Sequence, residues 1–249
     1  METSTASGWS LGLLGHWRLR REATAVDVGL RQQRFIAALA LCGPRSRGNL
    51  ASLLWPDSTE SHAAGSLRTC LFEISHRLPA LVRCRSGVVE LDDVTVDVDL
   101  VHRLLHEIEL TRGACGDPDA VDAICTAELL PGWYDDWVVY EQERLTHRRL
   151  AALDSIAEAA IRRGDAVHAV RSAEAAVALE PLRESSHLLL MQGHLLAGNR
   201  IAAYRAYELL QDRLDRELGI EPAREFADLM SQIATGASPA RPPVRTARW

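Results

Sequence analysis

Apolar and polar residues alternate weakly at the start of the chain, and the spacing then becomes helical. The alternation predicts short strands at residues 9–13, 17–19 and 26–28. Helices are expected where the apolar spacing lengthens and a proline follows, at residues 32–41, 47–55 and 61–78. Two strands around the turn dipeptide Ser86-Gly87 are expected at residues 81–85 and 88–91, and a further strand at 94–98. The first part of the chain is therefore predicted to be a small mixed domain that ends in a hairpin.

The third of these helices has two different faces. Its apolar residues recur at helical spacing and predict one buried stripe, formed by Leu67, Leu71, Ile74 and Leu78. The centre of the opposite face carries His62, Gly65, Thr69, Phe72 and His76, with Arg68 and Glu73 on its flanks. A helix that is buried on one side and exposed on the other can enter the major groove of DNA. The order of strands, three helices and a hairpin is that of an OmpR-type winged helix.

From Asp99 onward the spacing is helical only, with helices expected at residues 100–108, 119–129 and about 138–163. An aromatic cluster lies at the start of the last helix, and we interpret it as a packing seam rather than a ligand pocket: Trp133, Tyr134, Trp137 and Tyr140.

The sequence then repeats with a period of about 34 residues, which is the tetratricopeptide (TPR) period. The corresponding pairs are Ile161 with Leu195, Gly164 with Gly198, Asp165 with Asn199, and Ala169 with Ala203. The glycines are expected to form the turn inside each helical hairpin, and the alanines to lie where two helices approach closely.

These patterns predict a mainly α protein with a small β component. A winged helix-turn-helix domain is expected over residues 1–98 and an all-α TPR-like domain over residues 99–235. The last segment, residues 236–249, is rich in proline and arginine and is expected to be disordered.

Charge differs between the two halves of the chain. The net charge is −6, but residues 1–87 hold 11 arginines against 6 acidic residues, a net charge of +5. Residues 88–249 hold 17 arginines against 28 acidic residues, a net charge of −11. The basic part can meet phosphate, whereas the acidic part would be repelled by it.

Several function classes lack support in the sequence. No apolar run is long enough to span a bilayer, and Met1–Gly8 has no signal-peptide pattern, so we expect a cytoplasmic protein with no membrane partner. The five cysteines form no C-x-x-C pair, and we expect reduced thiols rather than a redox switch. No catalytic spacing stands out, and the pair His102 and His106 has no third metal ligand in view. We therefore expect no enzyme activity, no metal and no cofactor.

With both halves placed, the chain resembles the antibiotic regulatory protein family of actinobacteria, and more broadly proteins with a bacterial transcriptional activator domain. The resemblance covers roughly residues 9–235, and its most specific stretches are Leu129-Leu130-Pro131-Gly132-Trp133-Tyr134-Asp135-Asp136-Trp137 and Glu217-Leu218-Gly219-Ile220-Glu221-Pro222. It implies an OmpR-like DNA-binding domain followed by a TPR-type activator domain. It also implies binding to direct repeats in double-stranded promoter DNA, as side-by-side protomers that recruit RNA polymerase.

The predicted DNA contacts lie on the third helix and on the hairpin after it. They are Arg68, Thr69, Phe72, Glu73, His76 and Arg77 from the helix, and Arg83 and Arg85 from the hairpin. Phe72 leaves two alternatives open, contact with a thymine methyl or a place in the core. Glu73 is a departure from the arginine-rich recognition helices of the family. It could accept a hydrogen bond from cytosine, although a carboxylate near phosphate is unfavourable.

We therefore expect a sequence-specific DNA-binding transcriptional regulator, acting as an activator. The alternative is a protein-interaction adaptor whose winged helix no longer binds DNA. The acidic Glu73 and the modest charge of +5 in the first part of the chain support this alternative.

Overall fold

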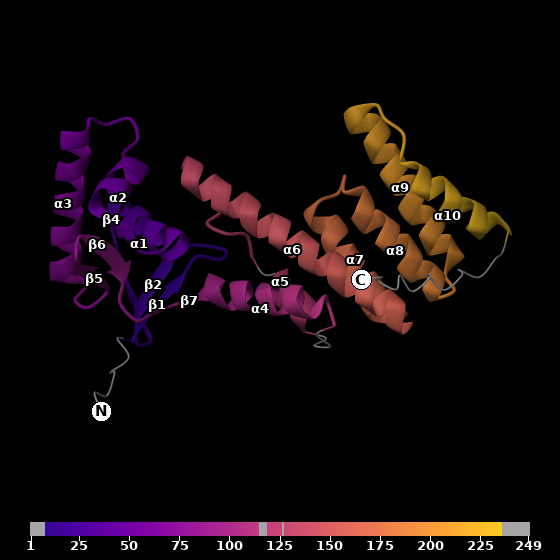
Figure 1. Ribbon diagram of the computed structural model, residues 1–249, viewed down its shortest axis with the longest axis horizontal. Helices are drawn as coiled ribbons and strands as arrows, with labels where there is room; N and C mark the ends of the chain where they lie inside the picture. Colours follow the sequence, from indigo (N-terminus) through magenta and orange to yellow (C-terminus); the bar gives the residue numbers. More distant parts are fainter. Residues whose placement is uncertain (1–7, 115–118, 126, 236–249) are drawn as a thin grey trace, which may run out of the picture. The chain divides into compact units, whose positions relative to one another are not determined.

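The computed structural model describes residues 8–114, 119–125 and 127–235. The chain is mainly helical with two small sheets, which confirms the predicted fold class (Figure 1). It divides into two compact units, Met1–His102 with Ala127–Glu143, and Arg103–Thr126 with Arg144–Trp249. The predicted disordered tail, residues 236–249, lies outside the described residues.

The first unit begins with a four-stranded sheet. Its strands are β1 (Trp9–Gly12), β2 (Arg18–Arg21), β3 (Thr24–Val26) and β7 (Val94–Val96), in the order β3-β2-β1-β7. Strand β2 is antiparallel to both β1 and β3, while β7 is parallel to β1. This sheet explains the alternation of apolar and polar residues in the sequence. Trp9, Leu11 and Leu19 are buried on one face, whereas the arginines of β2 are exposed.

The helices and the hairpin of this unit follow in the predicted order. They are α1 (Leu30–Cys42), α2 (Arg47–Leu54), α3 (Glu60–Arg77), β5 (Val82–Arg85) and β6 (Val88–Leu91). Ser86 and Gly87 both have positive φ, as a two-residue type I′ turn requires. A two-residue strand that the sequence did not predict, β4 (Arg45–Ser46), pairs with β6 and gives a second sheet of order β4-β6-β5.

The strand expected at residues 94–98 ends two residues early. Helix α4 (Asp97–Thr111) starts there, and the Asp97 carboxylate accepts hydrogen bonds from the backbone N–H groups of Leu13 (2.9 Å) and Leu14 (3.1 Å). A side chain that bonds to the backbone of a neighbouring segment cannot be recognised from local alternation.

The helix expected at residues 119–129 is also shorter, because α5 covers only Ala120–Ile124. Leu129 forms a β-bridge with Leu14 instead, and the N–H of Leu130 donates to the carbonyl of Leu13 at 2.8 Å. The prediction was wrong because these long-range backbone bonds outweigh the helical spacing of the side chains.

Residues 127–143, which we call the strap, therefore belong to the first unit although they follow part of the second in sequence. Beyond the bridge to Leu14, the Asp135 carboxylate accepts a hydrogen bond from Arg34 of α1. Arg34 also donates to the carbonyl of Leu54 at the end of α2, at 3.1 Å. The unit is thus larger than the domain expected over residues 1–98.

The aromatic cluster of the strap does not form one pocket. Trp137 is buried, whereas Tyr134 and Tyr140 are 85% and 63% exposed. Only part of the cluster therefore packs in the way a seam would.

The second unit consists of helices. The long helix α6 (Asp136–Arg163) starts in the strap and is followed by α7 (Ala166–Leu179), α8 (Glu184–Leu196), α9 (Arg200–Leu218) and α10 (Arg224–Thr235) (Figure 1). Helix α8 packs against both α7 and α9. None of the helices that the structure describes combines the length and the apolar character needed to span a bilayer.

The 34-residue repeat is visible at each predicted position. Gly164 and Gly198 have φ values of 78° and 74° and separate consecutive helices. Asp165 and Asn199 both cap the following helix, through hydrogen bonds from the N–H groups of His168 and Ala202. Ala169 and Ala203 are fully buried at the helix contacts.

Candidate nucleic-acid interface

Helix α3 is buried along one side, but its rotation differs slightly from the prediction. Leu67, Ile74 and Leu78 are buried as expected, while Leu71 is only half-buried. Cys70 completes the stripe in its place, with its Sγ 4.0 Å from the carbonyl oxygen of Arg31 in α1. Burial raises the pKa of the Cys70 thiol to about 12, so this cysteine is a neutral core residue.

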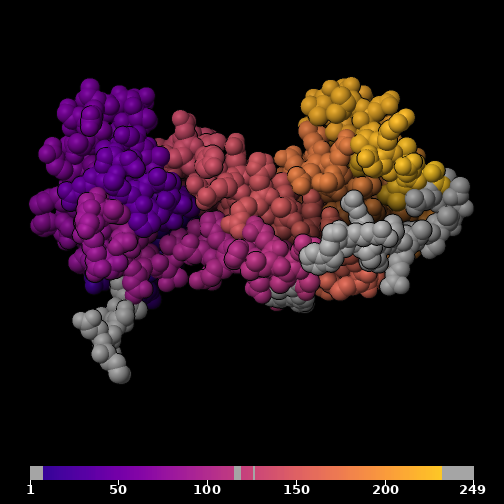
Figure 2. Space-filling model, viewed as in Figure 1, coloured from indigo at the N-terminus to yellow at the C-terminus, as the bar shows by residue number. Residues whose placement is uncertain are grey.

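The opposite side of α3 faces solvent, and the helix forms part of the surface of the first unit (Figure 2). Thr69, Phe72 and His76 are all exposed there. Phe72 is 63% exposed, so the structure excludes the alternative that places it in the core. Its ring lies against that of His76, with the two centroids 4.2 Å apart and the planes inclined by 38°. An aromatic pair at the centre of an exposed helix face is an unusual use of apolar surface.

Glu73 lies to one side of this face and is half-buried. Its carboxylate accepts a hydrogen bond from the side-chain amide of Gln32 in α1. Arg77, one turn further along, is exposed on the same side of the helix. The carboxylate therefore has an intramolecular partner, and contact between Glu73 and a base has less support than the sequence suggested.

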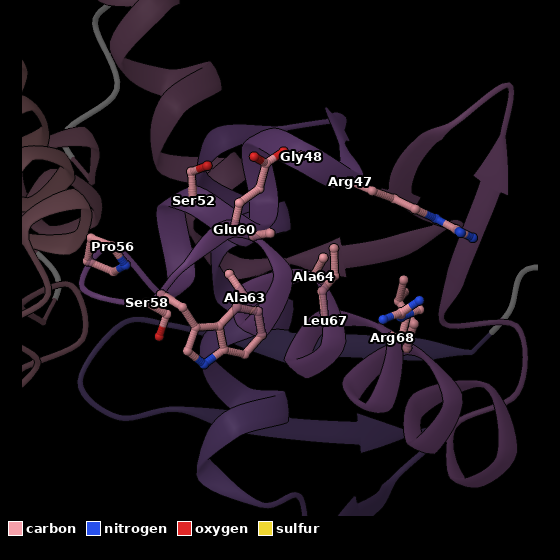
Figure 3. Close-up of a pocket in the computed structure, with 13 residues that line it drawn as sticks. Arg47, Gly48, Ser52, Pro56, Ser58, Glu60, Ala63, Ala64, Leu67 and Arg68 are labelled. Carbon is pink, nitrogen blue, oxygen red and sulfur yellow. The ribbon is translucent and has the colours of Figure 1, made fainter.

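The other flank of α3 carries Arg68, which is exposed and lines a groove between α2 and α3 (Figure 3). The groove has a volume of about 480 Å³, and Arg47 lines it as well. Both arginines lie at one end of it, and Pro56 lies at the other (Figure 3). Arg47 was not among the contacts predicted from the sequence. Its position just after the capping residue Ser46 was the available signal, because the first turn of a helix exposes backbone N–H groups that favour anions.

The two arginines of the hairpin have different surroundings. Arg83 forms ion pairs with Glu90 and Asp92, each with a nitrogen–oxygen distance of 2.9 Å. Arg85 ends β5 immediately before the turn, is exposed, and forms no ion pair with the described residues. Of the two predicted hairpin contacts, only Arg85 presents an uncompensated charge.

The basic character of the first unit is local. The strap brings five acidic residues into this unit, Glu128, Asp135, Asp136, Glu141 and Glu143. The net charge of +5 over residues 1–87 is therefore not the charge of the whole unit. Among the exposed arginines of this unit, Arg47, Arg68, Arg77 and Arg85 lie on α3, at the start of α2 and on the hairpin.

Comparison with known proteins assigns the second part of the chain. The bacterial transcriptional activator domain matches residues 125–234. Two curated relatives are the regulatory protein AfsR of Streptomyces griseus and the transcriptional regulator RedD of Streptomyces coelicolor. AfsR is 27% identical over 92% of this chain, and RedD is 37% identical over 34% of it. The chain spans about a quarter of the length of each relative (25% in both cases).

A solved structure has the same fold. Mycobacterium tuberculosis EmbR, in complex with a low-affinity phosphopeptide, superimposes with a TM-score of 0.67 at 20% sequence identity. The match covers 92% of this chain and 65% of EmbR. At this identity the likeness concerns the fold, a winged helix-turn-helix followed by a helical domain.

Proposed function

We propose that the chain is a sequence-specific DNA-binding transcriptional activator of the antibiotic regulatory protein type, in which a winged helix-turn-helix precedes a bacterial transcriptional activator domain. The observation that carries the proposal is the exposed face of α3. It presents Thr69, Phe72 and His76 to solvent, with Arg68 beside them. These residues have the size and chemistry to reach base edges in a major groove.

The arginines around α3 supply the contacts to the DNA backbone. Arg47 lies in the first turn of α2, where exposed N–H groups add to its attraction for phosphate. Arg85 lies at the tip of the hairpin, where a winged helix reaches the neighbouring backbone or minor groove. These contacts fix the position of the protein on the duplex, and the α3 face then selects the sequence.

The helical unit supplies the protein contacts in this proposal. Its role is to recruit RNA polymerase, while two copies of the chain occupy a direct repeat as a homodimer on DNA. The match of residues 125–234 to the activator domain supports the assignment of the protein contacts to the helical unit.

The test is a fluorescence anisotropy titration of the full chain against labelled promoter fragments, at two salt concentrations. We expect saturable binding to one fragment, weaker binding to a scrambled duplex, and a steep loss of affinity with salt. Arg68→Ala should weaken the specific complex. Arg216→Ala, which removes the same charge from an exposed position of α9, should not. If the folded protein binds no fragment even at low salt, the DNA-binding proposal fails and the adaptor alternative is favoured.

A further inference from the structure

We propose that Phe72 and His76 form a single reading unit that selects a thymine next to an adenine or cytosine amino group in the major groove. This inference rests on the proposed function, because it assigns base preference to the same α3 face. It starts from the 4.2 Å contact between the two rings and from the hydrogen bonds made by their neighbours.

The centre of the α3 face has few free hydrogen-bond donors. The Thr69 hydroxyl donates to the carbonyl of Gly65 at 3.2 Å, and the Ser75 hydroxyl donates to the carbonyl of Phe72 at 2.8 Å. Both hydroxyl hydrogens are therefore used within the helix. A guanine edge presents two acceptors, N7 and O6, and needs donors from the protein. This part of the face is poorly suited to guanine.

The same argument fixes which nitrogen of His76 faces the DNA. Its Nδ1 lies 3.1 Å from the carbonyl oxygen of Phe72. A carbonyl oxygen can only accept, so Nδ1 must carry the hydrogen. In a neutral imidazole the other nitrogen, Nε2, is then an acceptor. In the major groove the base donors are the amino groups of adenine and cytosine, so His76 selects for one of these.

Phe72 supplies the apolar half of this reading unit. Its ring is 63% exposed and also borders a depression between α3 and the hairpin, lined in addition by Leu71, Pro79 and Cys84. The apolar group that the major groove offers is the C5-methyl of thymine, which apolar side chains including phenylalanine contact. The stack with His76 holds the ring in place before DNA arrives, which lowers the entropy lost on binding.

The two arginines that α3 carries beside this reading unit do not alter the preference. Arg68 lies on the groove side of α3 and Arg77 on the side of Glu73, so both flank the ring pair. They can contact phosphate or a guanine at a neighbouring position. The preference assigned here concerns only the base opposite the Phe72–His76 stack.

The experiment uses the promoter fragment that the full chain binds in the titration above. Each thymine is replaced in turn by deoxyuridine, which lacks only the methyl group. Wild-type protein should lose about fourfold in affinity at one thymine of each half-site, which corresponds to about 0.8 kcal/mol for one buried methyl-sized group. Phe72→Ala should bind the thymine and uracil duplexes equally, and Phe72→Leu should retain part of the difference.

A matched control and a second probe complete the test. Leu100→Ala removes another exposed apolar side chain of the first unit and should keep the full difference between thymine and uracil. Replacing the neighbouring adenine by a purine without the amino group should weaken binding by wild type, but not by His76→Ala. The inference is overturned if no thymine is sensitive, or if Phe72→Ala keeps the wild-type sensitivity. Failure of wild type to bind any fragment would instead refute the proposed function.

Discussion

The two hairpin arginines provide a direct test of the proposed contact between this chain and the DNA backbone. Arg83 and Arg85 lie two residues apart in β5, and replacing either by alanine removes one positive charge. Their surroundings differ, because Arg83 pairs with Glu90 and Asp92 and Arg85 pairs with neither. We predict that Arg85→Ala weakens DNA binding clearly and that Arg83→Ala has little effect.

The size of the effect follows from counterion release. Each phosphate contact contributes about −0.9 to the slope of log K against log salt concentration. Arg85→Ala should therefore make this slope about 0.9 less negative. The affinity should fall roughly tenfold, because a hydrogen bond to a charged group contributes about 1.5 kcal/mol or more. The charge of Arg83 is already compensated, with both carboxylates 2.9 Å away, so its removal should leave the slope near the wild-type value.

The assay is anisotropy of the full chain over a series of salt concentrations, with one duplex and three proteins. Circular dichroism of each variant checks that the fold is kept. Equal changes of slope for both variants would refute the reasoning, since they would mean that the Arg83 ion pairs open on binding. An unchanged slope for Arg85→Ala would show that the hairpin does not contact phosphate.

Two further predictions concern the helical unit. A Cβ at Gly113 (φ 72°) would lie 2.1 Å from the carbonyl oxygen of Ser155, so Gly113→Ala should destabilise the protein by about 2–5 kcal/mol. A Cβ at Gly164 (φ 78°) would meet no atom within 4 Å, so Gly164→Ala should lower the free energy of unfolding, measured by urea denaturation, by only about 1–2 kcal/mol. Equal losses of free energy in the two variants would contradict this prediction. The Nε2–H of His187 donates to the carbonyl of Pro181 at 3.0 Å. Burial lowers the pKa of His187 in the folded protein, so as pH falls the unfolded chain is protonated at this residue before the folded chain is. Stability should therefore fall as pH drops below about 6.5, and by less in His187→Gln; identical urea midpoints of both proteins across this pH range would exclude the effect.

The parts of the fold that sequence predicts well are those set by local spacing. The order of strands, helices and hairpin in the first unit was correct, because a glycine or a proline follows each of α1, α2 and α3 within two residues and the hairpin turns at Ser86-Gly87. The TPR-like repeat was also correct to the residue. In both copies a glycine with positive φ, Gly164 or Gly198, forms the turn between two helices. The next residue, Asp165 or Asn199, caps the helix that follows.

The errors have a common cause in contacts between distant segments. Nothing near Leu129 indicates that its backbone will pair with Leu14. The ion pair of Arg83 with Glu90 is different, because the predicted turn at Ser86-Gly87 already places these two residues opposite each other in the hairpin. The exchange of Leu71 for Cys70 in the buried stripe depends on how α1 meets α3, which spacing along α3 alone does not determine.

The strap shows why the boundary of the first unit was the hardest feature to predict. The activator-domain match starts at residue 125, but residues 127–143 pack in the first compact unit. Their bonds satisfy the carbonyl of Leu13 and add a carboxylate partner to the guanidinium of Arg34, which also donates to the carbonyl of Leu54. The Leu129–Trp137 motif, which is the most specific sign of the activator domain, therefore also completes the winged helix. A division of this chain by sequence motif therefore differs from its division by packing.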